Sequence, residues 1–238
     1  MSLLEARLRS LGKTCTRRQR SQLHGLLLTS SLHRLPGLPA LLIRRATDIA
    51  DMAHADLLFS SFLRDLPDDA ALYNAMIRGC SYHGPHERAL DLFEEMLRRC
   101  LATDGFTYPY VLDACARLPT RRRYGEQVHC RVLKEGLDHV QAVGSSLLAF
   151  YLPGGGGSLG DARRLYDGMR VKAVGLANHM MSEYAKAGDA GSAREVFDAM
   201  TDRDVASWNW MLAMHVKSGD IVAAKELFAA MPLKNVLS

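Results

Sequence analysis

The sequence predicts an all-α fold, an α-solenoid of stacked helix–turn–helix repeats. One nine-residue string recurs four times in the 238-residue chain, and each copy ends in methionine. A second string of helical pattern, which ends in glycine, precedes each copy. A lone pair of helices of this size cannot bury its apolar face, so successive pairs must stack on one another.

The recurring string has the apolar pattern of one helix face. An alanine, a Leu or Val and an aromatic residue lie on one side of the predicted helix, and the methionine follows them. The last three copies are 31 residues apart, and a similar apolar pattern at 126–136 fills the longer interval before them. The strings lie at 88–96, 161–169, 192–200 and 223–231, and their small residues are Ala89, Ala162, Ala193 and Ala224.

The string that precedes each copy predicts the first helix of the pair. Glycine ends it because glycine most easily adopts the left-handed conformation that closes a helix. Pro85 or a short polar step then leads into the second helix. A Pro153 and Gly-rich insertion at 153–157 is expected to loosen one unit. The four first-helix strings are 73–84, 144–155, 177–188 and 208–219.

The residues of the first helix distinguish this chain from other helical-pair families. Tetratricopeptide repeats keep a period of about 34 residues, with Trp and Leu-Gly in the first helix. Here the period varies, and an aromatic residue or alanine precedes Asn74, Asn178 and Asn209. Residues 106–115 resemble a long repeat and 205–209 the start of a short one. From about residue 38 onward, the chain resembles the pentatricopeptide repeat proteins, specifically the plant PLS-type subclass, which implies a right-handed solenoid.

The resemblance divides the chain into repeats of unequal length. Residues 1–37 form a basic segment that is either a transit peptide or a degenerate repeat, and 38–69 form a degenerate repeat. A 35-residue repeat at 70–104 and a long-type repeat at 105–140 follow. Next come a short-type repeat with the Gly-rich insertion at 141–173 and short repeats at 174–204 and 205–235. Residues 236–238 resemble the opening of a truncated repeat.

In this family each repeat meets one RNA base through its fifth and last residues, and the first helices line a concave surface. Asparagine suits the fifth position because its amide both donates and accepts hydrogen bonds. The resemblance implies uridine for the first two of the pairs below and cytidine for the third. The alternative is that the asparagines cap or bond locally within the solenoid. The pairs are Asn74 with Asp104, Asn178 with Asp204, Asn209 with Asn235, and Ser145 with Ala173, whereas Pro109 with Val140 offers no side-chain hydrogen bond.

Two further positions bear on how the chain would hold RNA. The thirteenth position places Arg117, Lys186 and Lys217 in register, where they would follow a phosphate backbone or simply be solvated surface cations. The second position packs beside bases in this family, and it is mostly small here, which predicts little stacking and weak affinity. Its residues are Ala71, Phe106, Ala142, Gly175 and Ala206.

The charge and cysteine content of the chain bear on its partners and on its cell compartment. A net charge of +4 permits a polyanionic partner without demanding one. Up to Thr47 the only acid is Glu5, against nine Lys and Arg residues, which is typical of a transit peptide to a mitochondrion or plastid. The five cysteines have no C-x-x-C spacing, so we expect reduced thiols, most of them small buried hydrophobes.

The sequence predicts no catalytic residues, no cofactor and no metal site. The glycines at 154–157 are not followed by Gly-Lys-Ser/Thr and do not follow a predicted strand. His83 and His86 flank a helix break at Gly84-Pro85 with no cysteine or carboxylate pair nearby. The signature of a zinc deaminase is absent, so we recognise no C-terminal editing domain. No apolar run is long enough to span a membrane.

These patterns predict an RNA-binding adaptor that selects a pyrimidine-containing single-stranded site in an organelle. It would guide editing, processing or stabilisation of a transcript, with any editing or processing enzyme supplied in trans. Two alternatives stay open. One is an α-solenoid that binds a peptide or protein, and the other is a truncated repeat protein with too few units to act alone.

Overall fold

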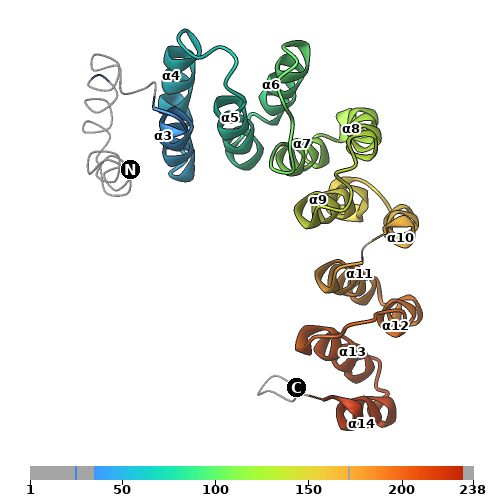
Figure 1. Cartoon of the computed structure of the whole chain (residues 1–238). Coiled ribbons are helices and arrows are strands. Elements are labelled where there is room, and N and C mark those ends of the chain that lie inside the picture. Colours follow the sequence, from blue (N-terminus) through green and yellow to red (C-terminus); the bar gives the residue numbers. More distant parts are fainter. Residues whose placement is uncertain (1–24, 26–34, 171, 233–238) are drawn as a thin grey trace. The chain divides into compact units, whose positions relative to one another are not determined.

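The computed structural model describes residues 25, 35–170 and 172–232. Within these ranges it contains the twelve α-helices α3–α14, two short 3-10 turns and no strand (Figure 1). The helices alternate with tight turns and short loops, as the recurring strings require. The predicted fold class, an all-α solenoid of stacked helix–turn–helix repeats, is confirmed. The truncated repeat at 236–238 and nearly all of the basic segment lie outside the described residues.

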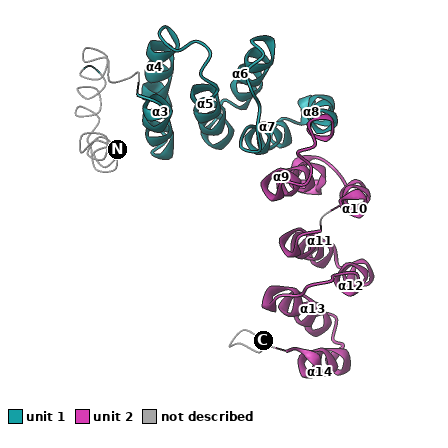
Figure 2. Ribbon diagram, viewed as in Figure 1, with its two compact units in different colours: residues 1–131 teal, residues 132–238 magenta. Residues whose placement is uncertain are grey.

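The chain forms two compact units, Met1–Arg131 and Val132–Ser238, which we call unit 1 and unit 2 (Figure 2). The helices of unit 1 are α3 (Leu38–Asp48), α4 (Met52–Leu63), α5 (Ala70–His83), α6 (His86–Arg98) and α7 (Thr107–Ala116), followed by the 3-10 turn η2 (Pro119–Arg121). Helix α8 (Arg122–Glu135) contains the boundary. Unit 2 continues with α9 (Gln141–Tyr151), the 3-10 turn η3 (Pro153–Gly155), α10 (Leu159–Gly168), α11 (Val174–Ala187), α12 (Ala190–Asp198), α13 (Val205–Lys217) and α14 (Ile221–Ala230).

Each unit has the same internal packing scheme. In unit 1 the first helices α3, α5 and α7 lie side by side, and in unit 2 so do α9, α11 and α13. The second helices α4, α6, α10 and α12 each pack against their own first helix and the first helix of the next pair. Each of these second helices therefore buries one face against two first helices.

The predicted apolar face of the second helix forms this core. Ala89, Ala162 and Ala193 are fully buried and Ala224 nearly so, because each small side chain lies where a neighbouring helix comes close. The aromatic residue of the string is buried in three copies, whereas Phe228 in α14 is 38% exposed. Burying a large apolar side chain such as Phe93 contributes about 1.5–3 kcal/mol, so each buried string stabilises the packing of its helix pair.

The helix ends follow the predicted signals, with one correction. Gly84, Gly188 and Gly219 have φ angles of 73°, 75° and 78°, in the left-handed region that favours glycine. The predicted first-helix string at 144–155 is not helical to its final glycine, because α9 ends at Tyr151 and Pro153–Gly155 form the turn η3. A Cβ on Gly157 would lie 1.9 Å from the Tyr151 carbonyl oxygen. The glycines therefore allow the turn to pack tightly against the end of α9.

Gly79 allows α5 to pack close to α3 in unit 1. A Cβ added there would lie 2.3 Å from Cγ2 of Thr47, a buried residue of α3. Thr47 cannot easily move away, because it is β-branched and its hydroxyl donates to the Arg44 carbonyl at 2.9 Å. The contact between α3 and α5 therefore depends on the missing side chain.

Replacing Gly79 with alanine should destabilise unit 1. Overpacking costs about 1–3 kcal/mol, which exceeds the gain of about 0.5–1 kcal/mol from replacing glycine within a helix. Urea unfolding followed by circular dichroism should show a lower midpoint. The control is Gly160→Ala in α10, where the nearest atom lies 3.7 Å from the added Cβ, so its midpoint should be unchanged or higher. An unchanged midpoint for Gly79→Ala would contradict the close contact.

Candidate nucleic-acid interface

In unit 2 the fold brings together Asn178 and Asp204, the fifth and last residues of one predicted repeat. Asn178 lies on α11, and its Nδ2 donates to the two carboxylate oxygens of Asp204 at 3.1 and 3.4 Å. Asp204 is also the N-cap of α13, where it accepts the backbone N–H of Ser207 at 2.8 Å. One carboxylate thus caps a helix and orients the amide on the preceding first helix.

These hydrogen bonds also control the charge of Asp204. Partial burial alone would raise the pKa of this carboxyl group. The backbone N–H of Ser207, the Asn178 amide and the Ser207 hydroxyl outweigh that effect and hold the pKa below its usual range. Asp204 is therefore a carboxylate at neutral pH and accepts hydrogen bonds only.

Two amide oxygens in unit 2 have no partner. Oδ1 of Asn178 and Oδ1 of Asn209 are buried and receive no hydrogen bond from the described residues. The orientation of the Asn178 amide follows from its neighbour, since only Nδ2 can donate to a carboxylate. A buried acceptor without a donor costs about 1–3 kcal/mol, which a ligand N–H could recover. The two acceptors occupy the same register on α11 and α13.

In unit 1 a threonine joins the corresponding pair. Thr107 Oγ1 lies 2.9 Å from Asn74 Oδ1 and 3.1 Å from Asp104 Oδ1, and it accepts the backbone N–H of Asp104 at 3.2 Å. Asp104 accepts the backbone N–H groups of Phe106 and Thr107 at the start of α7. Asn74 and Asp104 are therefore linked through one buried hydroxyl, whereas Asn178 and Asp204 bond directly.

A pocket of about 310 Å³ opens around this pair on the first helices of unit 1. It contains an amide, a carboxylate, two guanidinium groups and two aromatic rings, together with small apolar walls. This set of groups can hold a planar polar ligand that carries negative charge. The lining residues are Ala40, Arg44, Ala71, Asn74, Ala75, Arg78, Asp104, Phe106 and Tyr110.

Sequence reasoning missed Arg44, Arg78 and Tyr110 as pocket residues. Arg78 had a usable signal, because it lies one helical turn after Asn74 and so shares its face of α5. Phe106 is the one aromatic residue at the second position of a repeat. Arg44 lies on a helix of the degenerate repeat 38–69. The repeat alignment did not assign that residue to a face of the helix.

The remaining predicted base-reading residues are less well defined. Ser145 is half-buried on α9 and makes no hydrogen bond with the described residues. Asn209 lies on α13, but its predicted partner Asn235 lies outside the described residues. The local bonding considered as an alternative for the asparagines occurs at Asn74 and Asn178, and in both cases it leaves part of the amide free.

Two of the three predicted backbone-binding cations already have acidic partners. The Arg117 Nε donates to Asp113 at 3.1 Å, and Lys186 pairs with Glu183 on the same helix. Lys217 is exposed and forms no ion pair with the part of the chain that the structure describes. Both cations remain accessible within these pairs, since the Arg117 side chain is 49% exposed and that of Lys186 is 68% exposed.

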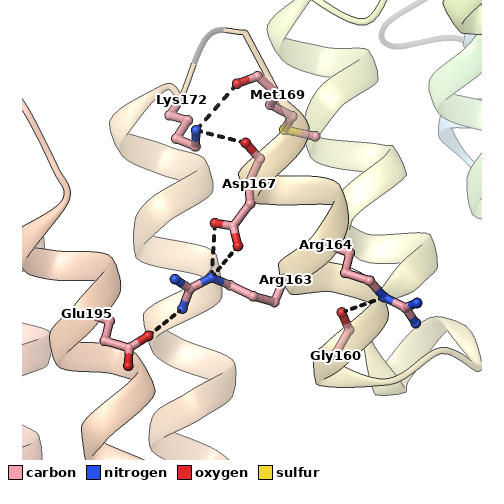
Figure 3. Close-up of polar contacts among 7 residues, drawn as sticks. All are labelled: Gly160, Arg163, Arg164, Asp167, Met169, Lys172 and Glu195. Carbon is pink, nitrogen blue, oxygen red and sulfur yellow. Dashed lines mark hydrogen bonds and ion pairs between the residues drawn. The ribbon is translucent and has the colours of Figure 1, made fainter.

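On the second helices α10 and α12 several charged side chains are paired within the protein (Figure 3). Arg163 on α10 donates to Asp167 at 2.8 Å and to Glu195 on α12 at 3.2 Å, which ties successive second helices together. The Lys172 Nζ donates to the carbonyl oxygens of Asp167 and Met169 at the end of α10. In unit 2 the polar groups without partners at Asn178 and Asn209 are on the first helices.

The four described cysteines comprise two buried and two exposed thiols. Burial raises the pKa of Cys80 to about 11 and that of Cys115 to about 12. Cys100 and Cys130 are exposed, so the expectation that most of the cysteines are buried fails for half of those described. No cluster of metal-binding side chains occurs among the described residues. None of the helices that the structure describes combines the length and apolarity that a membrane crossing requires.

The paired helices and the polar positions repeated along the first helices define a helical-repeat protein of the solenoid class. Residues 68–117 match the model of the PPR repeat family, and residues 177–205 and 206–236 each match the PPR repeat. The chain is therefore a pentatricopeptide repeat protein.

Relatives and solved structures agree with this identification. A putative pentatricopeptide repeat-containing protein of Arabidopsis thaliana is 34% identical over 160 residues, which is 67% of this chain and 22% of that protein. The crystal structure of the pentatricopeptide repeat protein PPR10 from maize superposes with a TM-score of 0.62 at 20% identity, over 94% of this chain and 33% of PPR10. PPR10 in complex with an 18-nt psaJ RNA element gives a TM-score of 0.53 at 19% identity, over 98% of this chain and 39% of that chain. The chain thus spans about a fifth of the Arabidopsis relative's length.

Removing the Asn178 amide should raise the pKa of Asp204. Because the folded-state pKa is depressed, the stabilisation by Asp204 is present above the ordinary carboxyl value of about 3.9 and is lost as the pH falls through the folded-state pKa. In Asn178→Ala one of the causes of the depression is gone, so the pKa should move toward its ordinary value. A titration of the carboxyl carbon chemical shift measures this change.

The control for this titration is Asp189, whose pKa is lowered by the backbone N–H and hydroxyl of Ser192. Asn178 donates to Asp204 and not to Asp189, so the variant should leave the Asp189 titration unchanged. Equal Asp204 titration curves in the two proteins would contradict the hydrogen bond.

Proposed function

We propose that the chain binds single-stranded RNA through its first helices, with one base met by each repeat. The observation that carries this proposal is the pair Asn178 and Asp204. The capping hydrogen bond fixes the carboxylate, the carboxylate orients the amide, and the amide keeps a buried acceptor without a partner. Such a preorganised polar pair loses little conformational entropy on binding.

The chemistry of the pair favours a uracil edge. Asn178 Oδ1 and the Asp204 carboxylate both accept hydrogen bonds, so they call for an N–H donor on the base. Uracil offers its N3–H, whereas cytosine presents a lone pair at N3, which an anionic acceptor disfavours. The direct pair on α11 and α13 therefore supports uridine at this repeat, as the family resemblance implies.

Affinity for the RNA backbone comes from the thirteenth-position cations Arg117, Lys186 and Lys217. Lys217 is available without rearrangement, whereas Arg117 and Lys186 would have to leave or share their partners Asp113 and Glu183. Binding should weaken with salt because each phosphate contact releases counterions. The 18-nt psaJ RNA element bound to PPR10 supports RNA as the class of ligand.

The proposed cellular role is that of an adaptor in organellar RNA editing, processing or stabilisation. It combines the PLS-type resemblance of the repeats with the basic, acid-poor composition up to Thr47. The chain would supply sequence selection, and an editing or processing enzyme would act in trans.

Changing Asp204 to asparagine tests the base-reading role. Asparagine remains a good N-cap, so α13 should stay folded. Loss of the negative charge removes the penalty on cytosine, and the preference at this repeat should shift from uridine toward cytidine by about 10-fold, or about 1.4 kcal/mol. Selection from a randomised single-stranded RNA pool, followed by Kd measurements on the two best sequences, provides the readout.

The matched control is Asp198→Asn on the second helix α12, where Asp198 pairs with Arg194. It removes the same charge from the other helix layer and should leave base preference unchanged. Retention of RNA with no change in preference in Asp204→Asn would exclude base reading at this pair. Enrichment of peptides and no salt-sensitive RNA retention would instead favour the protein-binding alternative.

A further inference from the structure

We propose that Arg203 is a positioning residue, which clamps the loop between α12 and α13 and thereby holds Asp204 in place for base reading. The inference rests on the proposed RNA binding and concerns how the reading pair is held, not what it contacts. Arg203 is the penultimate residue of its repeat, a position to which the family resemblance assigns no contact with RNA. It would touch no nucleotide and would still set how strongly this repeat discriminates between bases.

The first argument is the set of contacts that Arg203 makes with the end of α12. Its Nε donates to the Phe197 carbonyl oxygen at 3.0 Å, and its Nη2 donates to the Asp198 carbonyl oxygen at 3.2 Å. Both carbonyls belong to the last turn of α12, where carbonyl groups lack helical N–H partners and a cation is favoured. The guanidinium therefore ties the loop back to the helix that precedes it.

The second argument is an aromatic pair beside the same guanidinium. Phe197 of α12 and Trp208 of α13 form an edge-to-face pair with ring centroids 5.1 Å apart. The guanidinium carbon of Arg203 lies 4.5 Å from the Phe197 centroid and 6.0 Å from the Trp208 centroid. Cation–π attraction at these distances favours one position of the side chain. One cation thus joins the end of α12, the loop and the first turn of α13.

The third argument is that two neighbouring residues are fixed in opposite directions. Arg203 binds back to α12. Asp204 binds forward to the Ser207 backbone N–H on α13 and across to the Asn178 amide on α11. Because the peptide bond between Arg203 and Asp204 is planar, fixing one residue restricts the backbone of the next. Without the Arg203 contacts the loop would sample other conformations, and the Asp204 carboxylate would meet the Asn178 amide only part of the time.

Lys172, the penultimate residue of the preceding repeat, makes the same kind of contact. Its Nζ donates to the carbonyl oxygens of Asp167 and Met169 at 3.2 and 3.5 Å (Figure 3). It also lies 5.6 Å from the centroid of the Tyr166 ring. The residue that follows is Ala173, whose side chain cannot form a hydrogen bond. A lysine can therefore form this contact, and Lys172 supplies a matched control in which no base-reading carboxylate follows the cation.

The test compares Arg203→Ala and Arg203→Lys with the unaltered full chain. Hydrogen exchange of the Ser207 backbone N–H reports how firmly Asp204 is held, because this group donates to the Asp204 carboxylate. In Arg203→Ala the exchange should be about 10-fold faster, as expected when one hydrogen bond is weakened. The chemical shifts of the Asn178 amide protons should move toward those of a free amide. Arg203→Lys should stay close to the unaltered chain in both measurements.

Base preference provides the second readout. It is the ratio of the Kd values for two selected single-stranded RNAs that differ only in uridine or cytidine at this repeat. The preference for uridine should fall by about 3- to 10-fold in Arg203→Ala, and Arg203→Lys should restore most of it. If Arg203 instead contacted a phosphate, both RNAs would bind more weakly by the same factor and the salt dependence of Kd would decrease. That result would overturn the positioning role.

Two control variants separate loss of position from loss of stability or charge. Lys172→Ala removes a similar contact and should lower the thermal midpoint by about 2–4 °C, about as much as Arg203→Ala. Arg194→Ala removes an exposed arginine of α12 that pairs with Asp198. Both controls should leave the Ser207 exchange rate and the base preference unchanged.

The outcomes are distinct for the two proposals. If the unaltered chain prefers uridine and Arg203→Ala keeps both that preference and the Ser207 exchange rate, the positioning role is excluded while RNA reading stands. Faster exchange with an unchanged preference would make Arg203 a purely structural residue and would also overturn the proposal. If the unaltered chain shows no preference at this repeat, base reading fails and the positioning role fails with it. Faster exchange with reduced preference in Arg203→Ala, and recovery of both in Arg203→Lys, supports the positioning role.

Discussion

The structure depends on burying one face of each helix pair against the next. A second helix such as α6 packs on its own first helix and on the following one, so each apolar string has neighbours on two sides. Buried alanines such as Ala89 and Ala193 permit this close approach, and Gly79 permits a still closer one between α3 and α5. Since each pair contacts only its neighbours, stability is close to a sum of local terms.

This packing places the first helices side by side. The N-terminus of each first helix therefore lies close to the first helix that precedes it. Asp204 caps α13 and at the same time binds the Asn178 amide on α11. The same residue thus serves stability and the proposed base reading. Asp104 has both roles in unit 1, where the Thr107 hydroxyl stands between it and Asn74.

In unit 2 the two helix layers differ in how their polar groups are satisfied. In unit 2 the second helices join Arg163 to Asp167 and Glu195, which satisfies these groups within the protein. Within the part of the chain that the structure describes, Asn178 and Asn209 on the first helices have buried side-chain oxygens that receive no hydrogen bond, and Arg44 in unit 1 forms no ion pair. Groups that folding leaves unsatisfied are those that gain most from a ligand.

The sequence by itself determined the helix-pair repeat, the buried face and the helix-closing glycines, because these follow from local periodicity and backbone preference. The family resemblance also identified Asn178 and Asp204 as a pair, because they are the fifth and last residues of one repeat. Only the tertiary structure decided that Asn178 presents an acceptor, that Arg44 and Phe106 share a pocket with Asn74, and that the turn containing Gly157 is tight. These features depend on which side chains meet across neighbouring helices, and periodicity along one helix does not specify those contacts.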